Sequence, residues 1–197
     1  MSTLVFMLEE PSAKAMLEGI LPRLLSEGIA VKYMIFDGKQ DLHKQLVRRM
    51  RFWQEPDTQF VVMRDQDSSD CREVRQALQD LCAMAGRPDT LVRVACHELE
   101  SFYLGDLSAV EQGLSVKGLG RQQERRKFRN PDALANAAEE LRKLTEQRYQ
   151  KLGGSRAIAP HLDVSGKNRS RSFNTLVAGI RRIAASFDDG ARFSLKS

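Results

Sequence analysis

Two kinds of apolar pattern alternate along the first half of the chain. Short apolar runs with β-branched and aromatic members suit buried strands, and between them lie longer stretches whose apolar positions recur at helical spacing. The runs cover residues 3–8, 30–36, 58–63 and 91–95, and the helical stretches cover residues 11–25, 40–53 and 70–85, with another helix beginning near Glu98. Strands that alternate with helices predict βαβ units, and therefore the α/β class with a parallel sheet of about four strands flanked by helices.

The strand pattern stops after about residue 113. A basic segment leads to a helix predicted over residues 131–149, which Gly153-Gly154 is expected to separate from an irregular stretch. A last helix is predicted over residues 172–187, with Ser170 and Ser172 as its N-caps. We therefore expect residues 1–113 to form the α/β domain and residues 114–197 to form a basic, mostly helical extension packed on it.

Composition excludes several classes of protein. The chain is 42% hydrophobic and 29% charged, as globular proteins are, and no apolar run approaches the roughly 20 residues of a membrane helix. The first residues lack the basic leader of a signal peptide, and the three cysteines are isolated, unlike those of a disulfide framework or zinc cage. We expect a cytoplasmic protein with no membrane partner.

Positive charge gathers in two segments of the second half. The net charge is +5, and the region from Lys117 to Arg129 holds six basic residues against one acid, Glu124. A second cluster lies in the Ser- and Asn-rich stretch near residue 169. Such clusters can neutralise the phosphates of a nucleic acid, although a solvated linker can have the same composition. The residues predicted to contact nucleic acid are Arg125, Arg126, Lys127, Lys167, Arg169 and Arg171.

Acidic residues follow three of the four predicted strands. Glu9 follows the first strand, Asp65 and Asp67 follow the third, and Glu98 and Glu100 follow the fourth. Right-handed crossovers place the carboxyl ends of parallel strands at one edge of the sheet, where ligands bind. Carboxylates brought together repel one another unless a cation compensates, and Mg²⁺ or Mn²⁺ prefers hard oxygen ligands. The pattern predicts a divalent-metal site in which Asp65 and Asp67, as alternate residues, share one ion.

Several of these residues also have structural interpretations. Asp70 suits the N-cap of the third helix, and Glu98 or Glu100 suits an acid in the first turn of the fourth. His97 could ligate a metal or shuttle protons, whereas a structural hydrogen bond is the favoured interpretation for His161.

The acidic segments resemble the Toprim domain of topoisomerases, bacterial primases and overcoming-lysogenization-defect nucleases. The resemblance is carried by Leu8-Glu9-Glu10-Pro11-Ser12 and, two units later, by the pair Asp65-x-Asp67. The whole chain is also similar to a little-characterised bacterial family of Toprim-like proteins. It shares with them the blocks at residues 9–12, 64–68, 97–106 and 169–173.

The resemblance implies roles for the acidic residues. Glu9 would act as acid/base or metal ligand, Asp65 and Asp67 would bind metal, and Glu98 and Glu100 resemble the additional acids of nuclease-type Toprims. Which of these last two is the ligand stays open; Glu100 is the one we assign to catalysis. Topoisomerase-type domains carry Gly after the glutamate, where Glu10-Pro11 stands here, and no tyrosine is evidently placed for transesterification. Hydrolysis is therefore expected.

Relatives of this kind often lie beside an ATPase in mobile-element or phage-defence operons, so an ATPase partner is expected; the chain itself has no phosphate loop. The leading hypothesis is a metal-dependent nuclease acting on DNA or RNA. One alternative is a phosphoacceptor receiver domain, although no strand ending in the required lysine follows Ala95. The other is a non-catalytic module that binds nucleic acid or an ATPase.

Overall fold

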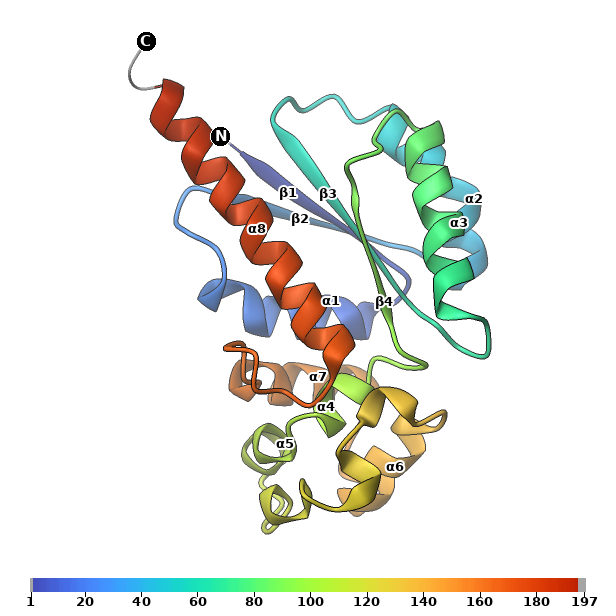
Figure 1. The fold of residues 1–197 in the computed structure, drawn as a ribbon, viewed down its shortest axis with the longest axis vertical. Helices are drawn as coiled ribbons and strands as arrows, with labels where there is room; N and C mark the ends of the chain where they lie inside the picture. Colours follow the sequence, from blue (N-terminus) through green and yellow to red (C-terminus); the bar gives the residue numbers. More distant parts are fainter. Residues whose placement is uncertain (1, 195–197) are drawn as a thin grey trace.

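A four-stranded parallel sheet organises residues 2–194, which are the residues that the computed structural model describes (Figure 1). The strand order is β2-β1-β3-β4, so β1 and β3 are central and β2 and β4 are the edges. The α/β class and the four-stranded parallel sheet flanked by helices are confirmed. The strands are β1 (Thr3–Leu8), β2 (Ala30–Ile35), β3 (Thr58–Asp65) and β4 (Leu91–Ala95).

Helices cover both faces of the sheet. α2 and α3 pack on one face, and α1 and α8 pack on the other, where the red α8 crosses the sheet in Figure 1. Four further helices, α4 to α7, form a layer beyond the carboxyl end of β4 (Figure 1). The helices are α1 (Pro11–Ile20), α2 (Gly38–Arg51), α3 (Cys71–Met84), α4 (Ser101–Leu104), α5 (Leu107–Leu114), α6 (Ala137–Leu144), α7 (Lys151–Ile158) and α8 (Arg171–Ser194). Short 3-10 helices are η1 (Leu21–Arg23), η2 (Gly120–Gln122), η3 (Arg126–Phe128), η4 (Pro131–Ala133) and η5 (Ala159–His161).

Alternation along the strands divides the core in two. Val5 and Met7 of β1 face α2 and α3, whereas Leu4, Phe6 and Leu8 face α1 and α8. Both sets are buried, which explains why the central strands are continuous apolar runs rather than alternating ones. The larger core cluster also includes residues of α5, α7 and α8, so the C-terminal helices complete the core on that face.

The middle of the second half differs from the sequence prediction. The single helix predicted over residues 131–149 is wrong, because only the short η4 and α6 are helical there and Glu146 and Gln147 take positive φ angles of 50° and 64°. Gly153 and Gly154 do not break a helix but lie inside α7. A Cβ at Gly154 would meet the Tyr149 ring at 2.3 Å, so this glycine is required for close packing rather than for a turn.

The last helix begins at Arg171, one residue before the predicted start, so the prediction of Ser172 as an N-cap is wrong and Ser172 lies in the first turn. The Ser170 hydroxyl accepts a hydrogen bond from the backbone N–H of Phe173 at 3.1 Å, which confirms Ser170 as the N-cap. Asp132, from η4, adds its carboxylate and accepts from the Ser172 N–H at 2.8 Å. α8 extends to Ser194, beyond the predicted end at Phe187. Among the described residues, no helix is both long enough and apolar enough to cross a membrane.

Candidate active site at the carboxyl edge of the sheet

The ends of β1 and β3 set the geometry of the acidic residues. β3 runs two residues further than the sequence pattern indicated, so Asp65 is its last residue. Leu8 pairs with Met63, and continuing this register places Glu9 level with Arg64 and Glu10 level with Asp65. Because successive side chains point to opposite faces, Glu9 and Arg64 lie on the α2 side of the edge, whereas Glu10 and Asp65 lie on the other side.

Arg64 organises the α2 side. Its guanidinium is buried and lies 3.7 Å from the Glu9 carboxylate and 3.1 Å from Asp67 Oδ2. Lys39, at the start of α2, reaches Asp67 Oδ2 at 2.8 Å. Glu9 Oε2 also accepts a hydrogen bond from the backbone N–H of Asp65 at 3.2 Å. Burial raises the pKa of Glu9, and the opposing attraction of Arg64 does not cancel that effect.

Three carboxylates form a second group on the opposite side, facing α7. We call Glu10, Asp65 and Glu100 the inner carboxylate group. Lys151, the first residue of α7, pairs with Glu10 at 2.5 Å and is the cation of this group. The Tyr149 hydroxyl donates to Glu100 at 2.8 Å, and Glu100 is almost fully buried.

Asp65 is the least compensated member of the inner carboxylate group. Burial raises its pKa well above the usual value, and the negative charges of Glu10 and Glu100 raise it further, while Lys151 opposes them. No side-chain hydrogen bond or ion pair to this carboxylate occurs among residues 2–194. Burial likewise raises the pKa of Glu100, although the Tyr149 hydroxyl lowers it. The site therefore carries negative charge that its own side chains do not neutralise.

A buried hydroxyl lies beside this group. Tyr103 is fully buried, and its hydroxyl has no hydrogen-bond partner among the residues that the structure describes. Burial raises its pKa well above the usual value, the nearby Ser155 hydroxyl opposes this, and the charges of Glu100, Glu10 and Asp65 add to the increase. A buried donor without a partner is uncommon, and water or a bound group next to the carboxylates would satisfy it.

The structure separates the two aspartates of the Asp65-x-Asp67 pair. Alternate residues share a side only while the chain stays extended, and Asp67 instead takes a left-handed φ of 57°. Its carboxylate therefore lies with Arg64 and Lys39, and its backbone N–H bonds the His97 carbonyl at 2.9 Å. Shared coordination of one ion by Asp65 and Asp67 would require this loop to rearrange.

Glu98 and Glu100 lie in different surroundings. Glu98 Oε2 accepts a hydrogen bond of 2.8 Å from the backbone N–H of Ala138, in the first turn of α6. That contact satisfies a free N–H and places a negative charge at the helix N-terminus. Since Glu100 belongs to the inner carboxylate group and Glu98 caps a helix, Glu100 is the better candidate ligand of the two.

A substitution separates these two roles. We expect Glu98→Ala to lower the free energy of unfolding by about 1 kcal/mol, because Ala138 loses its acceptor and α6 loses a favourable charge. Glu98→Gln keeps an acceptor oxygen and should lose less. Chemical denaturation measures both variants, and divalent-metal binding should be unchanged in each. Loss of metal binding with unchanged stability would assign Glu98 to the metal instead.

The donor set fits a magnesium-like ion only in part. Within residues 2–194, no three His, Cys, Asp or Glu side chains are gathered so that together they could hold a metal ion. Mg²⁺, however, commonly uses one or two carboxylates and completes its shell with water and phosphate oxygens. Asp65 with Glu10 or Glu100 meets that smaller requirement, and the ligands are hard oxygen donors.

The six predicted nucleic-acid contacts are all exposed. Lys127 pairs with Glu140, and Arg169 pairs with Glu124 at 2.6 Å, so both are engaged within the chain. Arg125 and Arg126 lie at η3, in the layer beyond β4, and Arg171 opens α8. His97 Nδ1 lies 3.2 Å from the Asp67 carbonyl oxygen. His161 is exposed at the end of η5.

Glu10, Lys151, Tyr103 and Tyr149 were not identified as site residues from the sequence. Glu10 could have been found, because it directly follows Glu9 at the end of the same strand. Lys151 lies 141 positions from Glu10 in a segment expected to be irregular, so no local pattern indicated that it would reach the site.

Comparison with known proteins adds a family. The model of one protein family, described as "Domain of unknown function (DUF4276)", matches residues 8–181. This range includes Glu9, both aspartates and the start of α8. No curated protein and no solved structure matches the chain.

Proposed function

We propose that this chain, which belongs to the DUF4276 family, is a divalent-metal-dependent nuclease that hydrolyses phosphodiester bonds in DNA or RNA. The proposal rests mainly on the environment of the Asp65 carboxylate. This partly buried carboxylate has no hydrogen-bonding partner among the described residues and lies in the field of Glu10 and Glu100. A desolvated carboxylate held beside other carboxylates is costly unless a cation joins it.

The charge balance of the edge supports the same proposal. When every carboxylate is ionised, five carboxylates lie there against three cationic side chains, which is a formal excess of two negative charges. A single divalent cation would balance that excess. The carboxylates are Glu9, Glu10, Asp65, Asp67 and Glu100, and the cations are Lys39, Arg64 and Lys151.

Each side chain then has a definite task. Asp65 with Glu10 or Glu100 would hold the ion, which when bound stabilises charge on phosphate oxygens. Tyr149 orients Glu100 through its hydroxyl, and Lys151 holds Glu10 until the ion competes for it. Arg64 fixes Glu9 and Asp67, and Glu9, with its raised pKa, is placed to accept or donate a proton.

The finer assignment to a Toprim-like nuclease is part of the proposal. It is supported by the motifs at Glu9 and Asp65 and by the parallel sheet that brings them to one edge. Mg²⁺ or Mn²⁺ is the expected cofactor, and nucleic acid and an ATPase encoded nearby are the expected partners. Phage defence by such a pair is the expected setting.

One observation favours a second candidate function. Glu9 and Asp67 already have cationic partners in Arg64 and Lys39, as they would in a site that no longer needs a metal. A non-catalytic module that binds nucleic acid or an ATPase is the function consistent with that pairing. It predicts salt-sensitive binding without cleavage.

A cleavage assay decides between them. Labelled single- and double-stranded DNA and RNA are incubated with the protein in Mg²⁺, in Mn²⁺ and in EDTA, with and without any ATPase encoded nearby. The nuclease predicts cleavage that requires the metal and survives in Asp80→Asn, which removes an exposed carboxylate of α3. Binding in EDTA with no product in either metal, with and without the ATPase, would establish the non-catalytic module.

Replacing the lysine of the site gives an independent prediction. Lys151→Met removes the cation nearest the inner carboxylate group, so in EDTA we expect the melting temperature to fall by about 3 °C or more. Millimolar Mg²⁺ should restore much of this loss, because the ion replaces the missing charge. Differential scanning calorimetry measures both. The control, Lys14→Met, removes a half-buried lysine that pairs with Glu18 on α1 and lies over the Tyr33 ring, and it should show no Mg²⁺-dependent recovery.

A further inference from the structure

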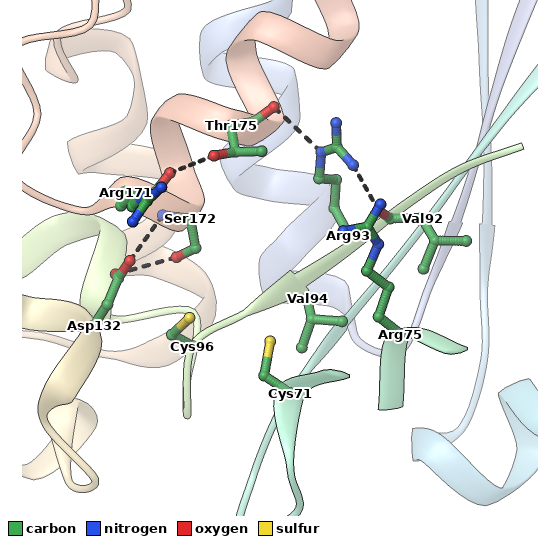
Figure 2. A pocket seen from close by; sticks show the side chains of 10 residues that line it. All are labelled: Cys71, Arg75, Val92, Arg93, Val94, Cys96, Asp132, Arg171, Ser172 and Thr175. Atoms are coloured by element: carbon green, nitrogen blue, oxygen red, sulfur yellow. Dashed lines mark hydrogen bonds between the residues drawn. The ribbon is translucent and has the colours of Figure 1, made fainter. Parts of the chain in front are cut away.

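A small pocket lies at the outer edge of β4, between α3 and α8 (Figure 2). Its volume is about 210 Å³, which suits a small chemical group rather than a large ligand. β4 is an edge strand, and the pocket opens along its unpaired side. None of the sequence patterns predicted a site here, although Arg171 was expected to contact nucleic acid.

Three arginines from different elements line this pocket. Arg75 comes from α3, Arg93 from β4 and Arg171 from the first turn of α8. In Figure 2, Arg75 and Arg93 lie close together on one side, and Arg171 lies on the other side with Ser172 and Asp132. Within residues 2–194, none of the three guanidinium groups has a carboxylate at ion-pair distance. The pocket therefore concentrates positive charge.

Arg93 is held firmly in place. It donates from Nε to the Thr175 carbonyl at 3.2 Å and from Nη1 to the Val92 carbonyl at 2.8 Å. A Cβ at Gly179 would lie 2.8 Å from its Nη2, so α8 leaves room for the guanidinium at that glycine. Burial lowers the pKa of Arg93 to about 10, and the charges of Arg75 and Arg182 lower it further, which places a fourth guanidinium nearby.

One acid, Asp132, lines the pocket against the three arginines, so the lining keeps a net positive charge. Asp132 accepts hydrogen bonds from the Ser170 hydroxyl at 2.6 Å and from the Ser172 N–H at 2.8 Å. Its carboxylate is thus committed to the N-terminus of α8. The arginines therefore have to bind an anion by their own guanidinium groups rather than by the helix end.

We infer that the pocket formed by Arg75, Arg93 and Arg171 binds a phosphate group. A guanidinium presents a planar set of N–H donors that matches phosphate oxygens, so the exposed Arg75 and Arg171 can donate to the anion while the fixed Arg93 adds positive charge. A dianion also relieves the mutual repulsion of the arginines, which a single carboxylate would do only in part. The phosphate can belong to a nucleic acid or to a small molecule. The inference does not rest on the proposed nuclease activity.

Binding is tested in EDTA, so that the carboxylate edge plays no part. Isothermal titration with inorganic phosphate, against chloride at equal ionic strength, should show saturable binding by the wild-type protein. Arg75→Gln and Arg93→Gln should each weaken it at least tenfold. Arg72→Gln, an exposed arginine on the same helix outside the pocket, should bind as the wild type does. Arg75 is exposed and without a described side-chain partner, so Arg75→Gln should fold normally even if Arg93→Gln does not.

An oligonucleotide with a 5′-phosphate, compared with the same oligonucleotide without it, identifies the source. A binding advantage from the 5′-phosphate that disappears in Arg75→Gln assigns the pocket to nucleic acid, and phosphate binding without that advantage assigns it to a small phosphate compound. The inference is overturned if phosphate binds no better than chloride. It is equally overturned if both pocket variants bind phosphate as tightly as the Arg72→Gln control.

Discussion

Asp65→Asn is expected to abolish metal-dependent cleavage, by at least about 100-fold, and at the same time to stabilise the folded protein. The loss of activity follows because the substitution removes the carboxylate that the surrounding residues leave uncompensated. The gain in stability follows because a neutral amide no longer repels Glu10 and Glu100. We expect the melting temperature in EDTA at pH 8 to rise by about 2 to 4 °C, equivalent to about 1 kcal/mol for a chain of this length.

The pH dependence of this gain has a definite sign. The folded-state pKa of Asp65 is raised, so the folded protein holds this proton more tightly than the unfolded chain does. Ionisation of Asp65 therefore destabilises the fold, and that penalty grows as the pH rises from the ordinary carboxyl pKa through the raised one. The advantage of Asp65→Asn should be largest at pH 8 and should shrink towards pH 4. Thermal unfolding across this range measures it, and a variant less stable than wild type at pH 8 would contradict the assignment.

Gly113→Ala is expected to lower the free energy of unfolding by about 2 to 3 kcal/mol, because it overpacks the contact between α5 and α7. A Cβ at this position would lie 2.6 Å from the Ala157 carbonyl oxygen and 2.7 Å from the Ile158 Cα. Both are backbone atoms, so the helices themselves have to move apart. The higher helix propensity of alanine, worth about 1 kcal/mol, offsets only part of this cost. Urea denaturation measures the difference.

Gly153→Ala is the matched control within α7. No atom lies within 4 Å of a Cβ built there, and the residue is exposed in a helix with an ordinary backbone conformation. The same chemical change should therefore stabilise the protein by up to about 1 kcal/mol. Equal effects at both glycines would contradict the close packing of α5 on α7. That packing matters for the site because α7 begins with Lys151.

The sheet could be predicted from the sequence because buried parallel strands leave a strong local signal. Thr3–Leu8 and Leu91–Ala95 are predicted with the bounds that the structure shows, since each is an apolar run closed by polar residues. The caps at Asp70 and Ser170 were also identified, and the structure confirms them. Each of these features depends on residues that are neighbours in the chain.

The C-terminal half could not be predicted equally well because its structure depends on distant contacts. The segment around Gly153 and Gly154 contains residues typical of a turn, yet the second glycine is needed to fit the Tyr149 ring against α7. The break after α6 depends on the positive φ angles of Glu146 and Gln147, two residues that ordinarily favour helices.

The candidate site was predicted in its location but not in its grouping. Glu9, Asp65 and Glu100 were expected at one edge of the sheet, and the structure brings them there. The register of β1 against β3, which the sequence does not reveal, places Asp65 beside Glu10, and the left-handed φ of Asp67 separates the two aspartates. Lys151 lies 141 positions from Glu10 in the sequence, so no local pattern links the two.

Manganese binding measured by electron paramagnetic resonance tests the central claim most directly. Free Mn²⁺ is titrated into the wild-type protein, Asp65→Asn and the control Asp80→Asn at pH 7.5 and low salt. If Glu10, Asp65 and Glu100 need a divalent cation, the wild-type and control proteins bind Mn²⁺ with a similar dissociation constant and Asp65→Asn binds it at least tenfold more weakly. Equal binding by all three proteins, or no binding by the wild type, would contradict the account.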